Sequence, residues 1–201
     1  MPMLEPNWRQ ERPSSTDVQK MWKELQITQE PFPHPAIDNV LRHLRATHTN
    51  GGAEFAQFKV SEHPTLHWFG ARNRLDEIDF FDRFLSSSPV SSALPALKID
   101  ASGVSGAGFE WGDTLTLDGE IAQVLVQGGA YEKYAGTARE AKEIAGRFCV
   151  AVFGERFTEV QVYKSYKPWS DWFYDVAWDA TWLGFDKRHV KVWLLCVTDT
   201  D

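Results

Sequence analysis

The stretch W-F-Y-D-V-A-W-D-A-T-W-L-G-F-D-K-R-H-V-K-V-W-L-L-C-V-T-D, residues 172–199, says more about the fold than any other part of the sequence. It is rich in aromatic and β-branched residues, which favour strands. The four residues 186–189 divide it and have a length typical of a hairpin loop. We therefore predict two antiparallel strands, 172–185 and 190–199. A preceding strand at 158–166 completes a three-stranded meander over about 157–199.

The pairing of these two strands can be predicted from the loop length. If Phe185 lies opposite Val190, the apolar side chains of both strands form one consistent ladder on one face. The pairs that this closure predicts are Trp182 with Trp193, Ala180 with Leu195, and Trp178 with Val197. Most tryptophans of this region are therefore expected in the core rather than at a ligand.

A helix is the alternative structure for the first half of the stretch, because Asp171, Asp175 and Asp179 recur every four residues. On a helix their carboxylates would be close enough to share a cation. The abundance of Trp, Tyr, Phe, Val and Thr favours the strand. On a strand, residues four apart are separated by roughly 13 Å, too far to bind one metal ion or flank one glycosidic bond. We therefore expect neither a metal site nor a cofactor.

Upstream of the meander, apolar residues recur mainly at helical spacing, and two segments have the Thr-x-x-Gln or Thr-x-x-Glu form of a capping box. The predicted helices run from Thr16 to about Gln29, from Ile37 to a stop at Asn50-Gly51, from Asn73 to Leu85, from Asp118 to Val126, and from Thr137 to a stop at Gly154. Two short strands are predicted at 55–60 and 65–69.

These elements predict one α+β domain over residues 15–201, with helices from both halves packed on an antiparallel sheet. Residues 1–14 contain three prolines and no periodicity, so we expect an extended N-terminal arm. The Gly/Ser-rich stretch 86–119 is expected to be a long loop or a pair of edge strands. A subdomain break within it is the alternative.

Composition excludes several classes of protein. The chain has 201 residues, 43% of them hydrophobic and 24% charged, which is typical of a globular protein rather than a disordered or membrane protein. The net charge of −7 disfavours nucleic acid as a partner. Cys149 and Cys196 are far apart, each in an apolar run. With no leading signal segment, these features predict a cytoplasmic protein with reduced thiols.

The sequence contains no strong catalytic motif. The run G-V-S-G-A-G at 103–108 nearly matches the nucleophile pattern G-x-S-x-G, but Ala107 replaces the second glycine and no helix follows. Ser105 is therefore expected to be an ordinary loop residue. The histidines are scattered, and none is spaced like a zinc ligand pair.

The turn before the stretch suggests a binding surface. Pro168 cannot donate to a sheet ladder, so the turn is expected at a sheet edge with its side chains facing outward. Exposed aromatic and charged groups of this kind anchor protein interfaces. The predicted binding residues are Lys167, Trp169, Asp171, Trp172, Asp175 and Asp179, together with Lys187 and Arg188 of the basic hairpin tip.

Two functions fit these features. The first is a cytoplasmic, non-catalytic protein-binding domain, of the bacterial toxin-neutralising (immunity) type or a scaffold, with a basic protein as partner and no membrane or nucleic acid. The alternative is a small soluble hydrolase-like enzyme. Its site would combine Asp175, Asp179 and His67, with the glycine-rich loop 101–113 as a lid.

Overall fold

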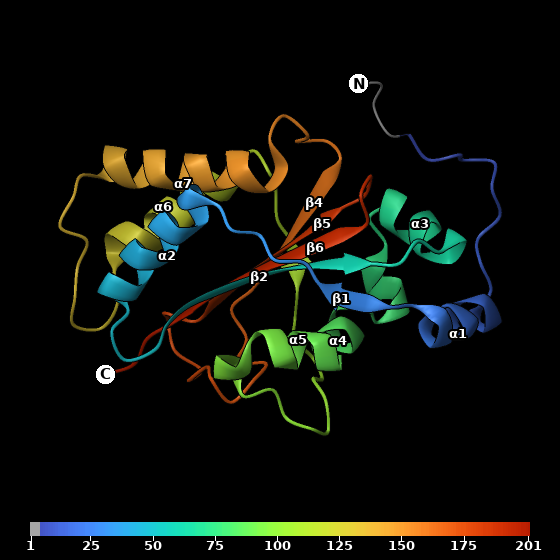
Figure 1. Ribbon diagram of the computed structural model, residues 1–201, viewed down its shortest axis with the longest axis horizontal. Coiled ribbons are helices and arrows are strands. Elements are labelled where there is room, and N and C mark those ends of the chain that lie inside the picture. The colour runs from blue at the N-terminus through green and yellow to red at the C-terminus, as the bar shows by residue number, and fades with distance from the viewer. Residues whose placement is uncertain (1–4) are drawn as a thin grey trace.

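A computed structural model of the chain describes residues 5–201, and within them six strands form one antiparallel sheet (Figure 1). The strands are β1 (Ile27–Gln29), β2 (Gly52–Val60), β3 (Glu110–Trp111), β4 (Val160–Ser165), β5 (Ala180–Asp186) and β6 (Lys191–Thr198). Their order across the sheet is β1-β2-β6-β5-β4-β3. The predicted C-terminal meander is thus present as β4, β5 and β6, and it lies in the middle of the sheet.

Helices cover both faces of the sheet. The helices are α1 (Ser15–Glu24), α2 (Pro35–Thr47), α3 (Pro64–Ala71), α4 (Phe80–Leu85), α5 (Ser88–Ala93), α6 (Leu117–Gln127) and α7 (Ala138–Phe153), with short 3₁₀ helices η1 (Leu75–Ile78) and η2 (Pro95–Leu97). One core joins α2, α6 and α7 to the first face, and a second core joins α1, α3, α4 and α5 to the other (Figure 1). The α+β fold with helices on an antiparallel sheet is confirmed.

The β5–β6 hairpin has the predicted faces but a different register. Trp182 pairs with Leu195, and Phe185 pairs with Val192, so the predicted register was wrong by two residues. A shift of two keeps every side chain on its face, whereas a shift of one would reverse them all. Trp182 and Trp193 are therefore both buried in the core beneath α6 and α7, as neighbours on a diagonal rather than as a direct pair.

Gly184 allows this arrangement, because it pairs directly with Trp193. A Cβ atom at Gly184 would lie 2.0 Å from Cε2 of the Trp193 indole. The indole instead packs edge-on against Phe148 of α7, with ring centroids 5.7 Å apart. The glycine thus lets the largest side chain of β6 lie flat across β5.

Helix α7 confirms its predicted capping box. Thr137 accepts from the Glu140 amide, and the Glu140 carboxylate accepts from the Thr137 amide. The helix ends at Gly154, which has a φ of 57°. Helix α6 likewise ends at Gly128, as predicted. Helix α7 depends on cap chemistry at both ends, which the sequence displays directly. Helix α6 begins at Leu117 rather than at Asp118, after Thr116, which makes no side-chain cap hydrogen bond.

The first helix is shorter than predicted and has a different cap. Ser14, rather than Thr16, is the N-cap, and its partner in the capping box is Asp17. The helix ends at Glu24, and the next residues form edge strand β1, which pairs with the end of β2. Sheet pairing here replaces the last turn of the predicted helix.

Residues 65–69 form helix α3 rather than the predicted strand. Pro64 occupies the first turn, and the His63 ring accepts from the Thr65 amide as an N-cap. Leu66 and Phe69 are then buried in the core beneath the helix. The β-prone composition of this segment is overridden by its tertiary packing and its cap.

The predicted third helix is broken. Residues 75–78 form η1, and Asp79 then adopts a left-handed φ of 52° before α4 begins. Asn73 also has a positive φ and does not cap the helix. The predicted apolar stripe is nevertheless buried, because Leu75, Phe81 and Phe84 all reach the core.

The stretch 86–119 is more structured than predicted. It contains α5, η2 and edge strand β3, and β3 pairs with β4. Asn7, Gln10 and Arg12 of the predicted arm contact α3 or its C-cap, whereas residues 1–4 fall outside the described residues. Trp8 is 74% exposed, but the Trp68 indole donates to the Gln10 carbonyl over 3.2 Å.

Candidate functional site

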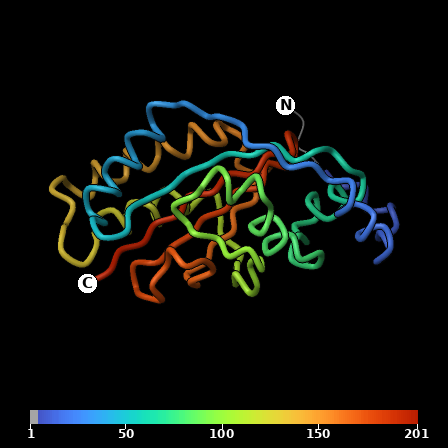
Figure 2. Tube along the Cα trace, turned by 60° about the horizontal axis from the view of Figure 1, so that its bottom comes forward, coloured from blue at the N-terminus to red at the C-terminus, as the bar shows by residue number. Residues whose placement is uncertain are grey.

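The residues predicted to bind a partner lie at the two ends of β5. Lys187 and Arg188 follow its last residue, at the hairpin tip. The others belong to the loop 166–179 that connects β4 to β5. Figure 2 shows this loop, in orange, beside the C-terminal end of the chain. The predicted site is therefore two separate regions.

The expectation that Trp169 and Trp172 face outward is wrong. They are only 7% and 8% exposed, respectively. The Trp169 indole donates to Thr181 Oγ1 over 2.9 Å and packs on the Phe173 ring. The loop folds back over the core on the α4 side of the sheet, so its aromatic side chains extend that core.

The loop also replaces the predicted first half of β5. Asp179 is 1% exposed, and its carboxylate accepts from Thr198 Oγ1 and from the amides of Tyr174 and Val176, at 3.2 and 3.1 Å. Asp179 thus holds the loop against the end of β6. Asp175 is exposed and has a φ of 58°, which a strand residue does not adopt.

Asp171 is exposed on the same loop and Lys167 is exposed near its start, next to Gly108 of the glycine-rich loop. Of the six predicted residues on this loop, Asp179 lines the small cavity described below. The strand prediction failed because the amides of Tyr174 and Val176 donate to the Asp179 carboxylate within the loop rather than to a neighbouring strand.

The basic hairpin tip is largely neutralised. Arg188 pairs with Glu159, and Arg156 pairs with Asp186. Burial raises the pKa of Asp186, but the hydrogen bonds from Arg156 and His189 together outweigh it and lower that pKa. The hydrogen bond from Arg188 is the main cause of the lowered pKa of Glu159. Lys187 is the exception, and its surroundings are described below.

The Asp and His residues of the hydrolase-like alternative do not form one site. His67 lies on α3, beside the Asp186 end of β5. Asp179 precedes the opposite end of β5, and a seven-residue strand is roughly 20 Å long. Asp175 faces solvent. These three groups therefore cannot act on one bond.

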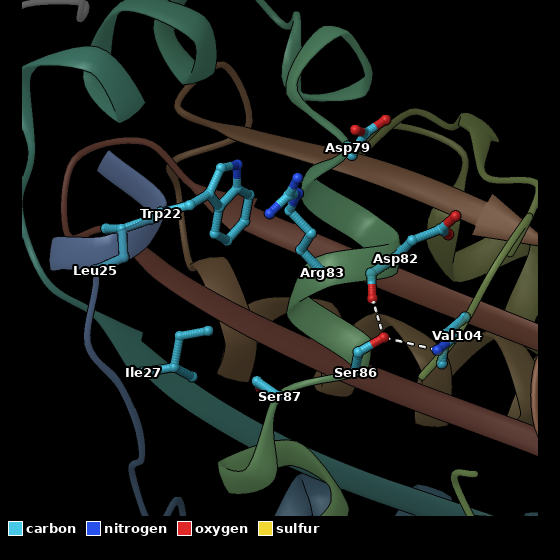
Figure 3. A pocket seen from close by; sticks show the side chains of 9 residues that line it. All are labelled: Trp22, Leu25, Ile27, Asp79, Asp82, Arg83, Ser86, Ser87 and Val104. Carbon is cyan, nitrogen blue, oxygen red and sulfur yellow. Dashed lines mark hydrogen bonds between the residues drawn. The ribbon is translucent and has the colours of Figure 1, made fainter. Parts of the chain in front are cut away.

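The glycine-rich loop is anchored to α4 (Figure 3). The amides of Gly106 and Ala107 donate to the Asp82 carboxylate over 2.7 and 3.1 Å. The Val104 amide donates to Ser86 Oγ, which itself donates to the Asp82 carbonyl. Three hydrogen bonds thus hold the loop that was predicted to act as a lid.

The open hollow beside this loop measures about 670 Å³. Its walls include Trp22, Asp79 and Arg83, and the Arg83 guanidinium lies over the Trp22 ring at 5.4 Å (Figure 3). Ser105 is exposed and does not line the hollow. The hollow therefore gives no support to a serine nucleophile.

A smaller and more enclosed cavity lies between α6, the end of α2 and the loop 166–179. Its volume is about 130 Å³. We call it the acceptor cavity, and its polar and aromatic lining residues are His48, Glu120, Gln123, Gln127, Tyr166, Trp178 and Asp179. Only Asp179 was among the residues predicted from the sequence.

His48 contributes an unpaired acceptor to the acceptor cavity. Its side chain is 1% exposed, and Nδ1 lies 3.1 Å from the Leu44 carbonyl. We assign the proton to Nδ1, because the Leu44 carbonyl can only accept and the Thr47 hydroxyl, 2.9 Å from Nδ1, itself donates to backbone carbonyls and can accept from the ring. This tautomer leaves a lone pair on Nε2. Within residues 5–201, Nε2 has no hydrogen-bond partner. Burial lowers the pKa of His48, which keeps the ring neutral at neutral pH.

Glu120 on α6 is fixed from two sides. Its carboxylate accepts from the Trp182 indole over 3.1 Å and from Lys164 over 2.9 Å. The hydrogen bond to Glu120 is the main cause of the raised pKa of Lys164. The core tryptophan of β5 thus orients a carboxylate that lines the acceptor cavity.

Aromatic residues complete the walls. Tyr166 is 53% exposed, and Trp178 is half-buried on the loop. The available sequence signal was on α6, where Glu120, Gln123 and Gln127 form a polar row at helical spacing. No local signal connects that row to His48 or Trp178, because these lie roughly 60 to 80 residues away.

Comparisons with known proteins give no functional information. No protein-family model matches the chain, and the search of curated proteins found no relative. None of the helices in residues 5–201 combines the length and apolar character needed to cross a bilayer. The same residues contain no cluster of three or more His, Cys, Asp or Glu side chains suited to a metal ion.

Proposed function

We propose that this chain is a protein-binding domain and that its acceptor cavity receives a basic side chain, a lysine ammonium or an arginine guanidinium, from a partner protein. The single observation that carries the proposal is the chemistry of the lining. His48, Glu120 and Asp179 all line one small enclosed space, and each carries an acceptor. Lys164 already pairs with Glu120, whereas Asp179 accepts from two amides and a hydroxyl, which leave its negative charge in place.

A donor-rich cation satisfies such a lining best. An ammonium carries three N–H donors and no acceptor, and a guanidinium carries five. His48 Nε2 is deeply buried, so an N–H donor that reached it would restore a hydrogen bond that burial otherwise denies it. The Tyr166 and Trp178 rings add faces that attract a cation.

The surroundings also suit a protein partner. Exposed aromatic residues close in sequence to the lining, Tyr131 and Tyr174, are 65% and 49% exposed, and such residues are enriched at interface cores. The net charge of −7 would attract a basic partner over distance. These features support the toxin-neutralising or scaffolding role. The two free, buried thiols support a cytoplasmic location.

The cavity chemistry can be tested with small probes. We expect butylammonium to bind the full chain with a dissociation constant on the order of millimolar, and neutral butanol to bind more weakly. Trp178→Ala should weaken butylammonium binding about fivefold, because a ring face next to the cation is lost. Chemical-shift perturbation by NMR would report the affinity and the location.

Trp111→Ala is the matched control, because Trp111 is 61% exposed on edge strand β3 and does not line the cavity. It should leave binding unchanged. Affinity purification from the native cell, with wild type and both variants, would then test the protein partner. Equal binding of butanol and butylammonium, or a partner retained by Trp178→Ala, would overturn the proposal.

A further inference from the structure

A second pocket lies at the opposite end of β5 and has the opposite chemistry. It is bounded by α3, by the residues after β5, and by residues 5–10 of the N-terminal arm, and its volume is about 250 Å³. We call it the cation pocket, because His67, Arg72 and Lys187 line it. Glu5 is the one acid in its lining among residues 5–201.

The surroundings of the Lys187 ammonium are the main evidence for the chemistry of this pocket. Its amide donates to the Glu159 carbonyl over 2.9 Å, which fixes the backbone beside the charged hairpin tip. The neighbouring arginines pair with Glu159 and Asp186, but within residues 5–201 no carboxylate lies within ion-pair distance of the Lys187 ammonium. Burial lowers the pKa of Lys187, and no opposite charge offsets that effect.

Arg72 adds a second charge that is not neutralised. Its guanidinium donates to the carbonyls of Trp68 and Asn7, which are uncharged acceptors, over 3.1 and 2.5 Å. It also lies over the Trp68 ring at 4.2 Å, with Trp8 of the arm further away at 5.5 Å. Carbonyls and ring faces orient the guanidinium, but they leave its positive charge in place.

Part of the remaining wall of the cation pocket is apolar, and Asn7 and Gln10 add polar groups. The apolar part includes Pro64, Trp68 and Phe185. Gly70 lets α3 approach β5 closely here, since a Cβ atom at this position would lie 2.6 Å from the Phe185 ring. The pocket therefore combines cations with aromatic side chains, and the Arg72 guanidinium lies directly over the Trp68 ring.

We propose that the cation pocket binds a small organic phosphate, a phosphate monoester with a compact apolar body. The phosphate oxygens would accept from Lys187 and Arg72, and the apolar body would pack on Trp68 and Phe185. Charge-assisted hydrogen bonds of this kind are about twice as strong as neutral ones. This site is independent of the acceptor cavity and does not rest on the proposed protein partner.

The pocket favours an anion even though the protein as a whole is acidic. With a net charge of −7, the chain would repel anions at most of its surface. Lys187 and Arg72 outnumber Glu5, the one acid of this lining within residues 5–201, so the charges that line the pocket favour an anion. The cation pocket is larger than a bare phosphate group requires, and its aromatic lining would have no partner in such a group. We therefore infer an organic ester, whose apolar body would contact the aromatic side chains.

Isothermal titration of the full chain with phenyl phosphate at low ionic strength tests this site. We expect saturable binding, little binding of benzyl alcohol, and about tenfold weaker binding of phenyl phosphate to Lys187→Gln. Lys187→Gln should fold normally, because the Lys187 ammonium makes no ion pair in residues 5–201. Lys187→Arg should retain most of the affinity because it keeps the charge.

Lys23→Gln is the matched control, because Lys23 is an exposed residue of α1 and the substitution removes the same charge. It should bind phenyl phosphate like the wild type. Equal weakening by Lys23→Gln and Lys187→Gln would show a general charge effect and overturn the proposal. Unchanged affinity in Lys187→Gln, or no binding of phenyl phosphate by the wild type, would also overturn it.

Discussion

The two ends of β5 satisfy their buried carboxylates in opposite ways. At one end, Asp179 accepts from two backbone amides and a hydroxyl, and no cation of residues 5–201 forms an ion pair with it. The adjoining cavity is lined by Asp179, by His48 and by Glu120, which pairs with Lys164. At the other end, Asp186 and Glu159 are paired with arginines, and the adjoining pocket keeps an unpaired lysine.

The difference shows that the local chemistry of a cavity depends on how nearby buried charges are compensated. Neutral donors satisfy the hydrogen bonds of a carboxylate but leave its negative charge in place. Ion pairs remove that charge. Strand β5 thus separates a cavity suited to cations from a pocket suited to anions. The net charge of −7 alone predicts only the attraction of cations.

Removing Trp182 should have the largest effect, because its side chain lies in the core between the two ends. Trp182→Ala should lower the free energy of unfolding by about 4 kcal/mol, since it leaves a large void under α6. It also frees Glu120 from its indole donor. Urea unfolding at neutral pH measures the change. A variant with wild-type stability would contradict the burial described for β5.

Trp169→Ala should act on the Asp179 end alone. The free energy of unfolding should fall by about 3 kcal/mol, because the substitution removes a buried ring and the hydrogen bond to Thr181. Phenyl phosphate binding at the opposite end should stay unchanged. If unfolding is unaffected but a partner protein is lost, Trp169 is a surface anchor after all, as the sequence alone suggested.

Asp186→Asn should destabilise the Lys187 end by about 2 kcal/mol, because it leaves Arg156 without its carboxylate in a partly buried setting. The lowered pKa of Asp186 means that its contribution is complete above the ordinary value of 3.8 and is lost as pH falls below it. Unfolding midpoints of wild type and variant should therefore converge at low pH. Parallel midpoints across this range would argue against the ion pair.

His48 should give a smaller effect with a different pH range. Its pKa is lowered, so the unfolded chain binds a proton below pH 6.5 while the folded chain does not. Stability should fall as pH drops from neutral to about 5, and His48→Gln should flatten that slope. Urea midpoints at several pH values report the slope. The same slope in both proteins would mean that another group titrates.

Ser105→Ala should have the smallest effect, because Ser105 is exposed on the anchored glycine-rich loop. It lines neither the acceptor cavity nor the cation pocket. Stability should change by less than about 0.5 kcal/mol, and both probe affinities should be unchanged. Calorimetric melting and the two titrations provide the measurements. A loss of any hydrolytic activity in this variant alone would revive the serine nucleophile.

Local chemistry made part of the fold predictable. The capping box at Thr137 and Glu140 places the start of α7, and Gly154 places its end. The alternation of apolar residues put Trp182 and Trp193 on one face, and this held even though the register differed. Face depends on parity along a strand, whereas register depends on contacts with the rest of the sheet.

The candidate sites were mostly hidden from the sequence. The acceptor cavity joins His48, Glu120 and Asp179, and the cation pocket joins Arg72 and Lys187 with the arm. The residues of each site come from segments roughly 60 or more residues apart. The sequence around each of these residues indicated only a solvated side chain or a core strand. Asp179 and Lys187 were found through the aromatic stretch and the basic tip that contain them.

By itself, the sequence determined features whose signals are local: the capping box and C-terminal glycine of α7, the presence of the three central strands, and the face on which Trp182 and Trp193 lie. Only the tertiary structure decided that residues 65–69 form a helix, that residues 172–179 form a loop, and which buried charges are neutralised. The physical reason is that caps and side-chain alternation act within a few residues. Burial and charge compensation depend instead on groups that folding brings together from distant parts of the chain.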